Sequence, residues 1–405
     1  MRVIIAGGGI GGLALALSLA EAGMQPVIYE RSPKVRELGV GINILPHAVR
    51  HLSDWGLMEA LDRTGIRTAE LLYRTARGQE ILRQARGVAA GLDAPQFSIH
   101  RGMLQGLMAE GVRARLGDAA LVTGHRLTGF EESPNGVVAT FETSDGPRRV
   151  EGDVLVGCDG IHSTLRDILH GAEGPPRWNG VLMWRGATWM PRFMTGASMV
   201  IAGGMRAKLV LYPIHHDPSR PDEALTNWVV CAAKGVPGDP LPVAQDWQAA
   251  APAEEALAEA DGLVLPDLDL EALIRGAPEI HVYPMCDREP LARWASPGGR
   301  ATLLGDAAHP MYPVGSNGAS QAVLDAVSLA AALRTDGVPG LIRYEADRRP
   351  ATAEIVRANR VGGPERVIDL VEERAPNGFE DLADVATDVE LTAIVGDYQR
   401  LTSVG

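Results

Sequence analysis

The stretch "VIIAGGGIGGLALALSLAEAG", residues 3–23, decides the fold because it has two interpretations. With Arg2 in front and small residues at its end, it fits a secretory signal. It equally fits the first strand, turn and helix of a nucleotide-binding fold. A signal sequence needs an apolar stretch but has no use for the glycine-rich run Gly7–Gly12, whereas a dinucleotide site requires one. We therefore expect a bound dinucleotide.

The glycines of this run have the spacing G-x-G-x-x-G, between a short apolar strand at 3–6 and a helix expected over 10–22. The first glycine permits a tight turn, the second lets a pyrophosphate approach the backbone, and the third lets helix and strand pack closely. The N-terminus of the helix would then point at the phosphates. The expected cofactor contacts from this turn are Gly7, Gly9, Ile10, Gly11 and Gly12.

An acidic residue follows at the distance that a ribose-binding residue requires. Residues 26–30 predict a second strand, and Glu30 lies 18 residues after Gly12. A carboxylate there binds ribose hydroxyls and repels a 2′-phosphate. Glu30 and the adjacent Arg31 are therefore expected beside the adenosine of FAD or NAD.

Composition narrows the class of protein. The chain has 405 residues, of which 46% are hydrophobic and 22% charged, which is typical of a globular enzyme of about two domains. A net charge of −13 argues against nucleic acid as a partner, and no apolar run is long enough to cross a membrane. Three widely spaced cysteines predict neither a disulfide framework nor a metal site. These features favour a cytoplasmic protein.

A second motif, "DVLVGCDGIHSTLRDIL" at residues 153–169, places Asp159 after a buried strand and before a helix. Two interpretations remain open here. Asp159 can cap the helix by accepting backbone N–H bonds, or it can take part in a cofactor site.

A third motif, "ATLLGDAAHPMYPVGSNGASQAVLDAVSLAAAL" at residues 301–333, is more informative. A strand leads to Asp306, which can accept a hydrogen bond from a polyol hydroxyl. A loop rich in proline and glycine then leads to a helix beginning near Asn317, whose first turn holds Gly318, Ala319 and Ser320. The free N–H groups and positive dipole of this turn suit a reduced flavin, which is negatively charged at N1 and O2.

Together these stretches resemble the class A flavoprotein aromatic monooxygenases, the para-hydroxybenzoate-hydroxylase fold, and within them the flavin-dependent hydroxylases of phenazine carboxylic acids. The resemblance also includes "LGVGINI", "QFSIHRG", "MWRG" and "YPMCDREPL". It implies an α/β fold in which a Rossmann-like FAD-binding domain carries an inserted antiparallel-sheet substrate domain. The expected FAD-binding domain is discontinuous, over 1–70, 98–177 and 279–361. The substrate domain is expected over 71–97 and 178–278, and 362–405 is a C-terminal tail.

The resemblance also implies roles for single residues. Gly41 would contact the cofactor, and Arg101 and Gln105 would reach the FAD diphosphate and ribose. Without the family, Arg101 is equally well explained as an exposed cation at a helix start. Glu30 would bind the adenosine ribose, and Asp159 would help to bind pyrophosphate and reduced pyridine nucleotide. Asp306 would bind the ribitol chain, and the backbone of Ala319 and Ser320 would bind the flavin pyrimidine edge. Pro313 would lie close to the reacting face of the flavin.

The chain carries one dinucleotide fingerprint, so FAD would stay bound while NADH or NADPH visits. In this family hydride reduces FAD, O2 adds at flavin C4a, and the hydroperoxide transfers oxygen to an electron-rich ring. Trp184 and Tyr212 are expected to line the pocket for a small, planar aromatic acid. Arg185 would bind the acid's carboxylate, or else pair within the protein. The protein would be a monomer or a dimer.

Two alternative functions use the same scaffold. A flavin-dependent halogenase needs a lysine near the substrate and a tryptophan-rich signature on the flavin loop. Residues 184–191 do not carry that signature, and only Lys208 and Lys234 lie in the region. A non-catalytic flavin-fold binding protein would have lost its FAD contacts, whereas Asp306 and the glycine loop are present.

Overall fold

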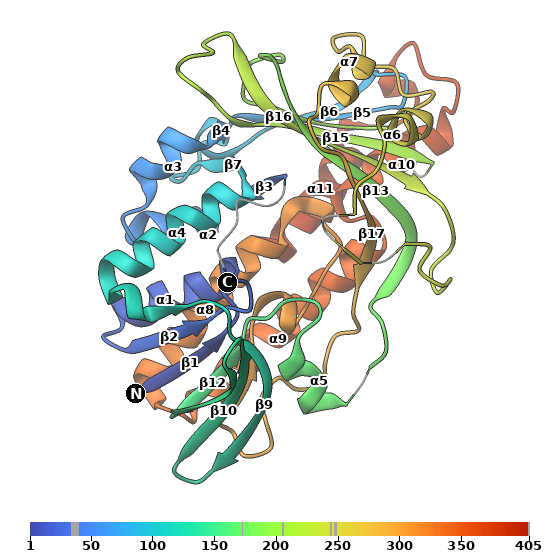
Figure 1. Ribbon diagram of the computed structural model, residues 1–405. Helices are drawn as coiled ribbons and strands as arrows, with labels where there is room; N and C mark the ends of the chain where they lie inside the picture. The colour runs from blue at the N-terminus through green and yellow to red at the C-terminus, as the bar shows by residue number, and fades with distance from the viewer. Residues whose placement is uncertain (34–39, 172, 205, 244, 247–248, 404–405) are drawn as a thin grey trace.

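The computed structural model describes residues 1–33, 40–171, 173–204, 206–243, 245–246 and 249–403. Two large sheets lie at opposite ends of the molecule, the five-stranded parallel sheet in the lower part of Figure 1 and a seven-stranded sheet in the upper part. The predicted combination of a Rossmann-like sheet with a largely antiparallel sheet is confirmed.

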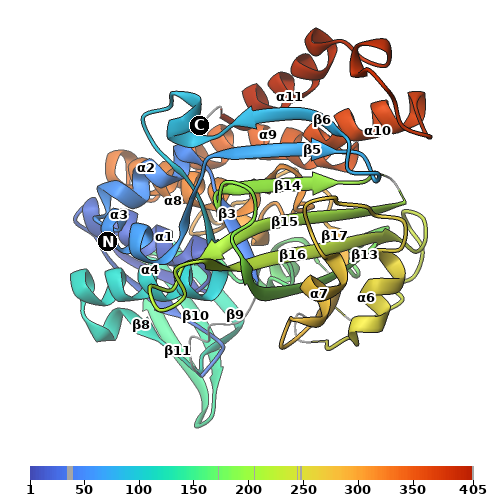
Figure 2. The same cartoon turned by 90° about the horizontal axis from the view of Figure 1, so that it is seen from above.

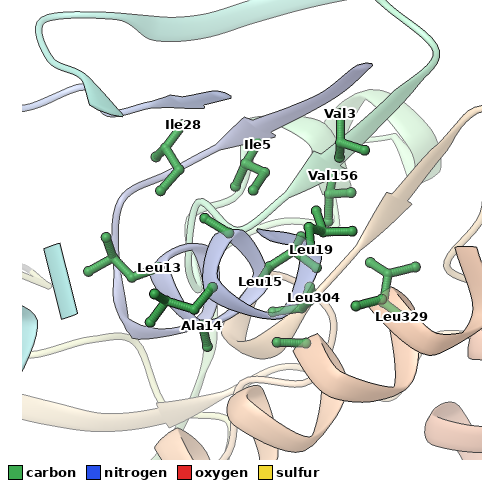
Figure 3. Packing of buried hydrophobic residues seen from close by; sticks show 14 of the residues in the cluster. Val3, Ile5, Leu13, Ala14, Leu15, Leu19, Ile28, Val156, Leu304 and Leu329 are labelled. Atoms are coloured by element: carbon green, nitrogen blue, oxygen red, sulfur yellow. The ribbon is translucent and has the colours of Figure 1, made fainter. Parts of the chain in front are cut away.

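The parallel sheet is built around the opening stretch of the chain. Its strands run in the order β18 (Ala301–Leu303), β12 (Val154–Gly157), β1 (Arg2–Ala6), β2 (Gln25–Tyr29) and β8 (Leu121–Val122). Helix α1 (Ile10–Glu21) packs on it, and its fully buried Leu13, Leu15 and Leu19 belong to the same apolar core as the strands (Figure 3). These apolar side chains form part of a folded core, and the strand, turn and helix predicted over residues 3–23 are confirmed.

The seven-stranded sheet is seen from above in Figure 2. Its order is β17 (His281–Asp287), β13 (Arg177–Pro191), β16 (Glu223–Ala233), β15 (Ala207–His215), β14 (Ser198–Ala202), β5 (Glu70–Arg74) and β6 (Glu80–Ala85). All neighbours pair antiparallel except β14 and β5, which are parallel. Strand β17, expected in the FAD-binding part, thus belongs to this sheet by pairing, while the division into domains stays a prediction.

Two three-stranded sheets and the remaining helices complete the fold. One small sheet contains β11 (Gly146–Gly152), β10 (Gly136–Thr143) and β9 (Arg126–Ser133), and the other β3 (Gly41–Ile44), β7 (Gln96–His100) and β4 (Ile66–Thr68). The other α-helices before the C-terminal segment are α2 (Pro46–Asp54), α3 (Met58–Thr64), α4 (Arg101–Leu116), α5 (Thr164–His170), α6 (Ala253–Glu259), α7 (Leu270–Arg275), α8 (Gly318–Asp336) and α9 (Gly340–Arg360). Short 3-10 turns are η1 (Gly87–Ala90), η2 (Asp118–Ala120), η3 (Gly305–Ala307), η4 (Val314–Ser316), η5 (Gly363–Glu365) and η6 (Leu382–Asp384).

The C-terminal segment is more ordered than a tail. It forms α10 (Arg366–Arg374) and α11 (Asp388–Ser403), whose buried Val371, Leu391 and Val395 join one apolar cluster with Tyr73 of β5. Figure 2 shows both helices beside β5 and β6. Residues 362–403 therefore complete one side of the seven-stranded sheet.

In the described part of the chain, no helix is both long enough and apolar enough to cross a membrane.

Candidate active site

A cavity of about 340 Å³ extends from the glycine-rich turn of the parallel sheet to one face of the seven-stranded sheet. Eleven of the predicted site residues line it: Gly9, Ile10, Gly11, Gly41, Arg101, Arg185, Tyr212, Asp306, Pro313, Gly318 and Ala319. Residues far apart in the sequence thus meet at one place, as the predicted site requires.

Packing explains the glycines of the first turn. A Cβ at Gly7 would lie 2.3 Å from the carbonyl oxygen of Cys158, and Gly7 has φ +112°, which few other residues adopt. A Cβ at Gly12 would lie 2.0 Å from the carbonyl oxygen of Gly7. A Cβ at Gly9, by contrast, would have no heavy atom of the described residues within 4 Å apart from its own chain neighbours. Gly7 and Gly12 hold β1 against its neighbours, while Gly9 leaves room for a ligand.

Glu30 lies at the end of β2, beside this turn. Its carboxylate accepts the Gly8 N–H at 2.7 Å and the Ser32 N–H at 2.8 Å. Gln105 of α4 donates to the Gly8 carbonyl at 2.7 Å, and Arg31 is exposed. None of these three side chains lines the described cavity. Glu30 and Gln105 fix the conformation of the turn, and their direct contact with an adenosine stays a prediction, as does that of Arg31.

Asp159 is a helix cap in this structure. One carboxylate oxygen accepts the Ser163 hydroxyl, and the other accepts the N–H groups of Thr164 and Leu165 at 2.8 and 3.3 Å. Cys158 and Gly160 line the cavity, but Asp159 does not. Of the two interpretations that the sequence left open, the capping one is confirmed, and a role with the cofactors stays a prediction.

The loop before α8 has an unusual backbone at the cavity wall. Gly315 has φ +67° and Ser316 has φ +59°, the left-handed region that a residue with a side chain rarely adopts. This conformation brings Pro313, Asn317 and Gly318 to the cavity. As the first residues of α8, Gly318, Ala319 and Ser320 have N–H groups without an acceptor inside the helix.

Two side chains of this region have acceptor atoms that suit a flavin. Asp306 lines the cavity with its side chain exposed to it, and burial by the surrounding protein raises its pKa, an effect that His309 and Arg101 oppose. The Oδ1 atom of Asn317 is buried without a hydrogen-bond partner among the described residues. The Ser320 hydroxyl instead accepts the Leu45 N–H at 3.0 Å, so only its backbone remains for a ligand.

Behind Asp306 lies a buried charged cluster that the sequence analysis missed. Asp325 of α8 contacts His309 Nε2 at 2.5 Å and Arg348 Nε at 2.8 Å, and it accepts the Gly305 N–H at 3.1 Å. Burial alone would raise the pKa of Asp325, but His309 and Arg348 hold it at about 2. The cluster ties α8, α9 and the Asp306 turn together, and no spacing in the sequence indicates it.

The face of the seven-stranded sheet supplies the other wall. In β13 Met183 and Arg185 line the cavity, whereas Trp184 between them does not. Trp184 is 3% exposed, packs in the cluster on the opposite face and donates to Glu255 of the α6 helix at 3.2 Å. The prediction that Trp184 lines the pocket is therefore wrong, because successive strand residues point to opposite faces of a sheet.

Arg185 and Tyr212 lie on the cavity face as predicted. Burial lowers the pKa of Arg185 to about 10, with Arg101 contributing and Tyr212 opposing, so the guanidinium is charged at neutral pH. Burial raises the pKa of Tyr212, which therefore stays a neutral phenol. Tyr283 and Met285 of β17 complete an aromatic and apolar wall around this cation.

Sequence reasoning did not find the ion pair at this wall. Lys208 of β15 contacts Glu365 of η5, and both residues line the cavity. Burial alone would lower the pKa of Lys208, but Glu365 and Asp369 raise it. Period-2 alternation with Tyr212 could have placed Lys208 on the cavity face, but its partner lies 157 residues away.

The residues present fit a flavin dinucleotide. The open space at Gly9, the Asn317 Oδ1 that has no partner among the described residues, the Asp306 carboxylate and the N-terminus of α8 all belong to the lining of one cavity. Gly9 leaves space for a pyrophosphate, and Asn317 Oδ1 offers a hydrogen-bond acceptor. The Asp306 carboxylate can accept from polyol hydroxyls, and the N-terminus of α8 offers N–H donors.

Comparison with known proteins agrees with this geometry. A family model described as "FAD binding domain" matches residues 1–213 and 281–359. The phenazine 1,6-dicarboxylic acid hydroxylase PhzS of Lysobacter antibioticus is 44% identical over 365 residues, which are 88% of this chain and 89% of that protein. The 3-hydroxybenzoate 6-hydroxylase 1 of Aquipseudomonas alcaligenes is 31% identical over 369 residues, 89% of this chain and 88% of that protein.

Solved structures show the same fold. The crystal structure of Klebsiella pneumoniae HpxO complexed with FAD and uric acid matches with a TM-score of 0.73 at 24% identity, over 99% of this chain and 92% of that one. The likeness therefore extends over both large sheets and the C-terminal helices.

Proposed function

Because the chain belongs to the class A FAD-dependent aromatic monooxygenases, we propose that it hydroxylates a planar aromatic acid of the phenazine-carboxylate kind at the expense of NADH or NADPH. One observation carries the proposal: a single cavity connects the flavin-type cradle of the parallel sheet with Arg185 on the seven-stranded sheet. A substrate held by Arg185 would lie in the same enclosed space as the ring end of the cofactor.

The chain's own residues would hold the cofactor at both ends. The Gly9 turn and the N-terminus of α1 would receive the pyrophosphate, Asp306 the ribitol hydroxyls, and the first N–H groups of α8 the pyrimidine edge of the ring. Bound FAD supplies the activation of O2 with electrons from the pyridine nucleotide. The protein supplies position, positive dipole and exclusion of water.

At the substrate end of the cavity, Arg185 is a charged group suited to a carboxylate. Arg185 can bind a carboxylate through two N–H groups, and its reduced hydration makes each bond stronger. Tyr212 and Tyr283 offer neutral hydroxyls, and Met183 and Met285 offer apolar contact to a flat ring. A planar aromatic acid matches this combination better than a sugar or an aliphatic acid.

The two alternative functions have less support. The amine of Lys208 contacts Glu365, which ties up the lysine that a halogenase would use in this cavity. A non-catalytic binding protein is disfavoured because Asp306 and the glycine turn keep their flavin-type geometry.

The test is a panel of aromatic acids with the purified protein. We expect a yellow protein whose NAD(P)H oxidation and O2 uptake rise with phenazine mono- or dicarboxylates, with little peroxide released. The neutral amides of the same rings serve as matched controls. A colourless protein that takes up no added FAD would refute the proposal, and so would O2 uptake recovered entirely as peroxide with every acid.

A further inference from the structure

The C-terminal helix reaches the loop that forms the ring end of the cavity. Tyr398 of α11 is 7% exposed, and its hydroxyl accepts a bond from Asn317 Nδ2 at 3.0 Å. The same hydroxyl shares its proton between Asn359 Oδ1 at 2.6 Å and the Val314 carbonyl at 3.1 Å. One oxygen atom thus connects α11, α9 and both ends of the loop Val314–Asn317.

The ring of Tyr398 packs as closely on the loop as its hydroxyl does. A Cβ at Gly315 would lie 2.4 Å from Tyr398 Cε1, and one at Gly363 would lie 3.0 Å from Tyr398 Cε2. Gly315 and Ser316 are the two residues of this loop with positive φ. An unfavourable backbone conformation persists only where the surrounding structure holds it. Here the ring of Tyr398 packs against Gly315 and is part of the structure that holds it.

The loop held in this way carries groups that line the cavity. Asn317 precedes the first turn of α8, and its Oδ1 is buried without a partner among the described residues while its Nδ2 donates to Tyr398 and to the Gly315 carbonyl. The orientation of the Asn317 amide, and with it the direction of Oδ1, is therefore set by α11. Gln321, one turn later, donates to the Thr402 carbonyl at 3.2 Å, a second link between the two helices.

We propose that Tyr398 is a positioning residue for the flavin: its hydroxyl orients Asn317 and the first turn of α8 against the pyrimidine edge of the ring. The inference rests on the proposed FAD site. The C-terminal segment thereby acts on the redox group from outside the part of the chain that binds the dinucleotide.

The test compares Tyr398→Phe with the matched control Thr188→Val in the holoenzyme. Tyr398→Phe keeps the ring that packs on Gly315 and removes only the hydroxyl. Thr188→Val also removes one buried hydroxyl, which donates to the Leu273 carbonyl at 2.7 Å and accepts from Trp228 Nε1 at 3.1 Å. Leu273 and Trp228 belong to the cluster of the seven-stranded sheet that faces away from the cavity. Both variants are measured for free energy of unfolding, FAD dissociation constant, flavin absorption spectrum and reduction potential.

We expect both variants to be destabilised, but only Tyr398→Phe to change the flavin. Its FAD dissociation constant should rise about fivefold or more, as for the loss of one hydrogen bond, and its reduction potential should become more negative. Reduced flavin is the form that the α8 dipole stabilises, which gives the sign. A Tyr398→Phe protein with wild-type spectrum, FAD affinity and potential overturns the inference. A wild-type protein that binds no FAD refutes the proposed function instead.

Discussion

Replacing Gly12 with alanine should damage the fold, whereas replacing Gly9 should damage only cofactor binding. A Cβ at Gly12 would lie 2.0 Å from the Gly7 carbonyl oxygen, where ordinary contact begins near 3.4 Å. Both partners are backbone, so α1 must move away from β1 and loosen the packing of Leu13 and Leu15. Overpacking of this kind costs about 3 kcal/mol or more, and the better helix propensity of alanine returns only about 1 kcal/mol.

Gly9 differs because its surroundings are open. Its backbone is extended, with φ −73° and ψ −177°, which any residue adopts, and no described heavy atom beyond its neighbours lies within 4 Å of the Cβ position. Alanine is a weaker N-cap than glycine, which costs about 0.5 kcal/mol, but it also makes the unfolded chain less flexible, which stabilises the folded state by about 0.5 kcal/mol. The stability of the apoprotein should therefore hardly change. The methyl group would occupy the space of the pyrophosphate, and FAD affinity should fall at least tenfold.

The assay pairs urea unfolding of each apoprotein with a titration of FAD followed by flavin fluorescence. The wild type and Gly9→Ala should unfold together and differ in FAD affinity, while Gly12→Ala should unfold at lower urea. If Gly9→Ala binds FAD as the wild type does, or loses as much stability as Gly12→Ala, the assignment of the turn to a dinucleotide is wrong.

Three further perturbations test the rest of the site. In steady-state kinetics, Arg185→Gln should raise KM for an aromatic acid about 10- to 100-fold, because a charge-assisted hydrogen bond to the substrate is lost. FAD content should not change, and Arg185→Lys should have an intermediate KM. An equal rise in KM for a neutral amide substrate would contradict this role. Asp306→Ala should lower the flavin absorbance per protein, and normal flavin content would contradict the ribitol role. The substitution should not destabilise the apoprotein, because burial raises the pKa of Asp306 and its ionised form therefore opposes folding at neutral pH. Asp325, with its pKa lowered from 3.8 to about 2, should contribute about 2 kcal/mol above pH 4 that is lost as pH falls to 2. The free energy of unfolding of the Asp325→Asn apoprotein should therefore depend less on pH between pH 4 and pH 2 than that of the wild type. The same pH dependence in both proteins would count against the His309–Asp325–Arg348 cluster.

Much of the cofactor end could be predicted because its signals are local. The glycine turn, the acidic residue after β2, and the Asp306 loop leading into α8 each lie within one short stretch, and their spacing reflects backbone sterics and helix ends. The substrate end was predicted less well. Both faces of β13 are covered, one by the cavity and one by the cluster with α6 and α7, so apolar alternation does not tell which face Trp184 occupies.

Proline limits the helices of residues 243–275. The described part of this segment holds only α6 and α7, since Pro252 immediately precedes α6 and Pro266 lies between the two helices. Three of its residues, 244, 247 and 248, lie outside the described residues, as do Leu38 and Gly39 of the "LGVGINI" stretch.

The sequence by itself determined that a dinucleotide turn opens the chain and that a polar, glycine-rich loop leads into a late helix. Tertiary structure alone decided which side chains meet across the cavity: Lys208 with Glu365, Asp325 with Arg348, and Tyr398 with Asn317. The physical reason is range. Backbone geometry and helix capping act over a few residues and leave a readable spacing, whereas contacts between elements 23 to 157 residues apart depend on how whole sheets and helices pack, which no local pattern encodes.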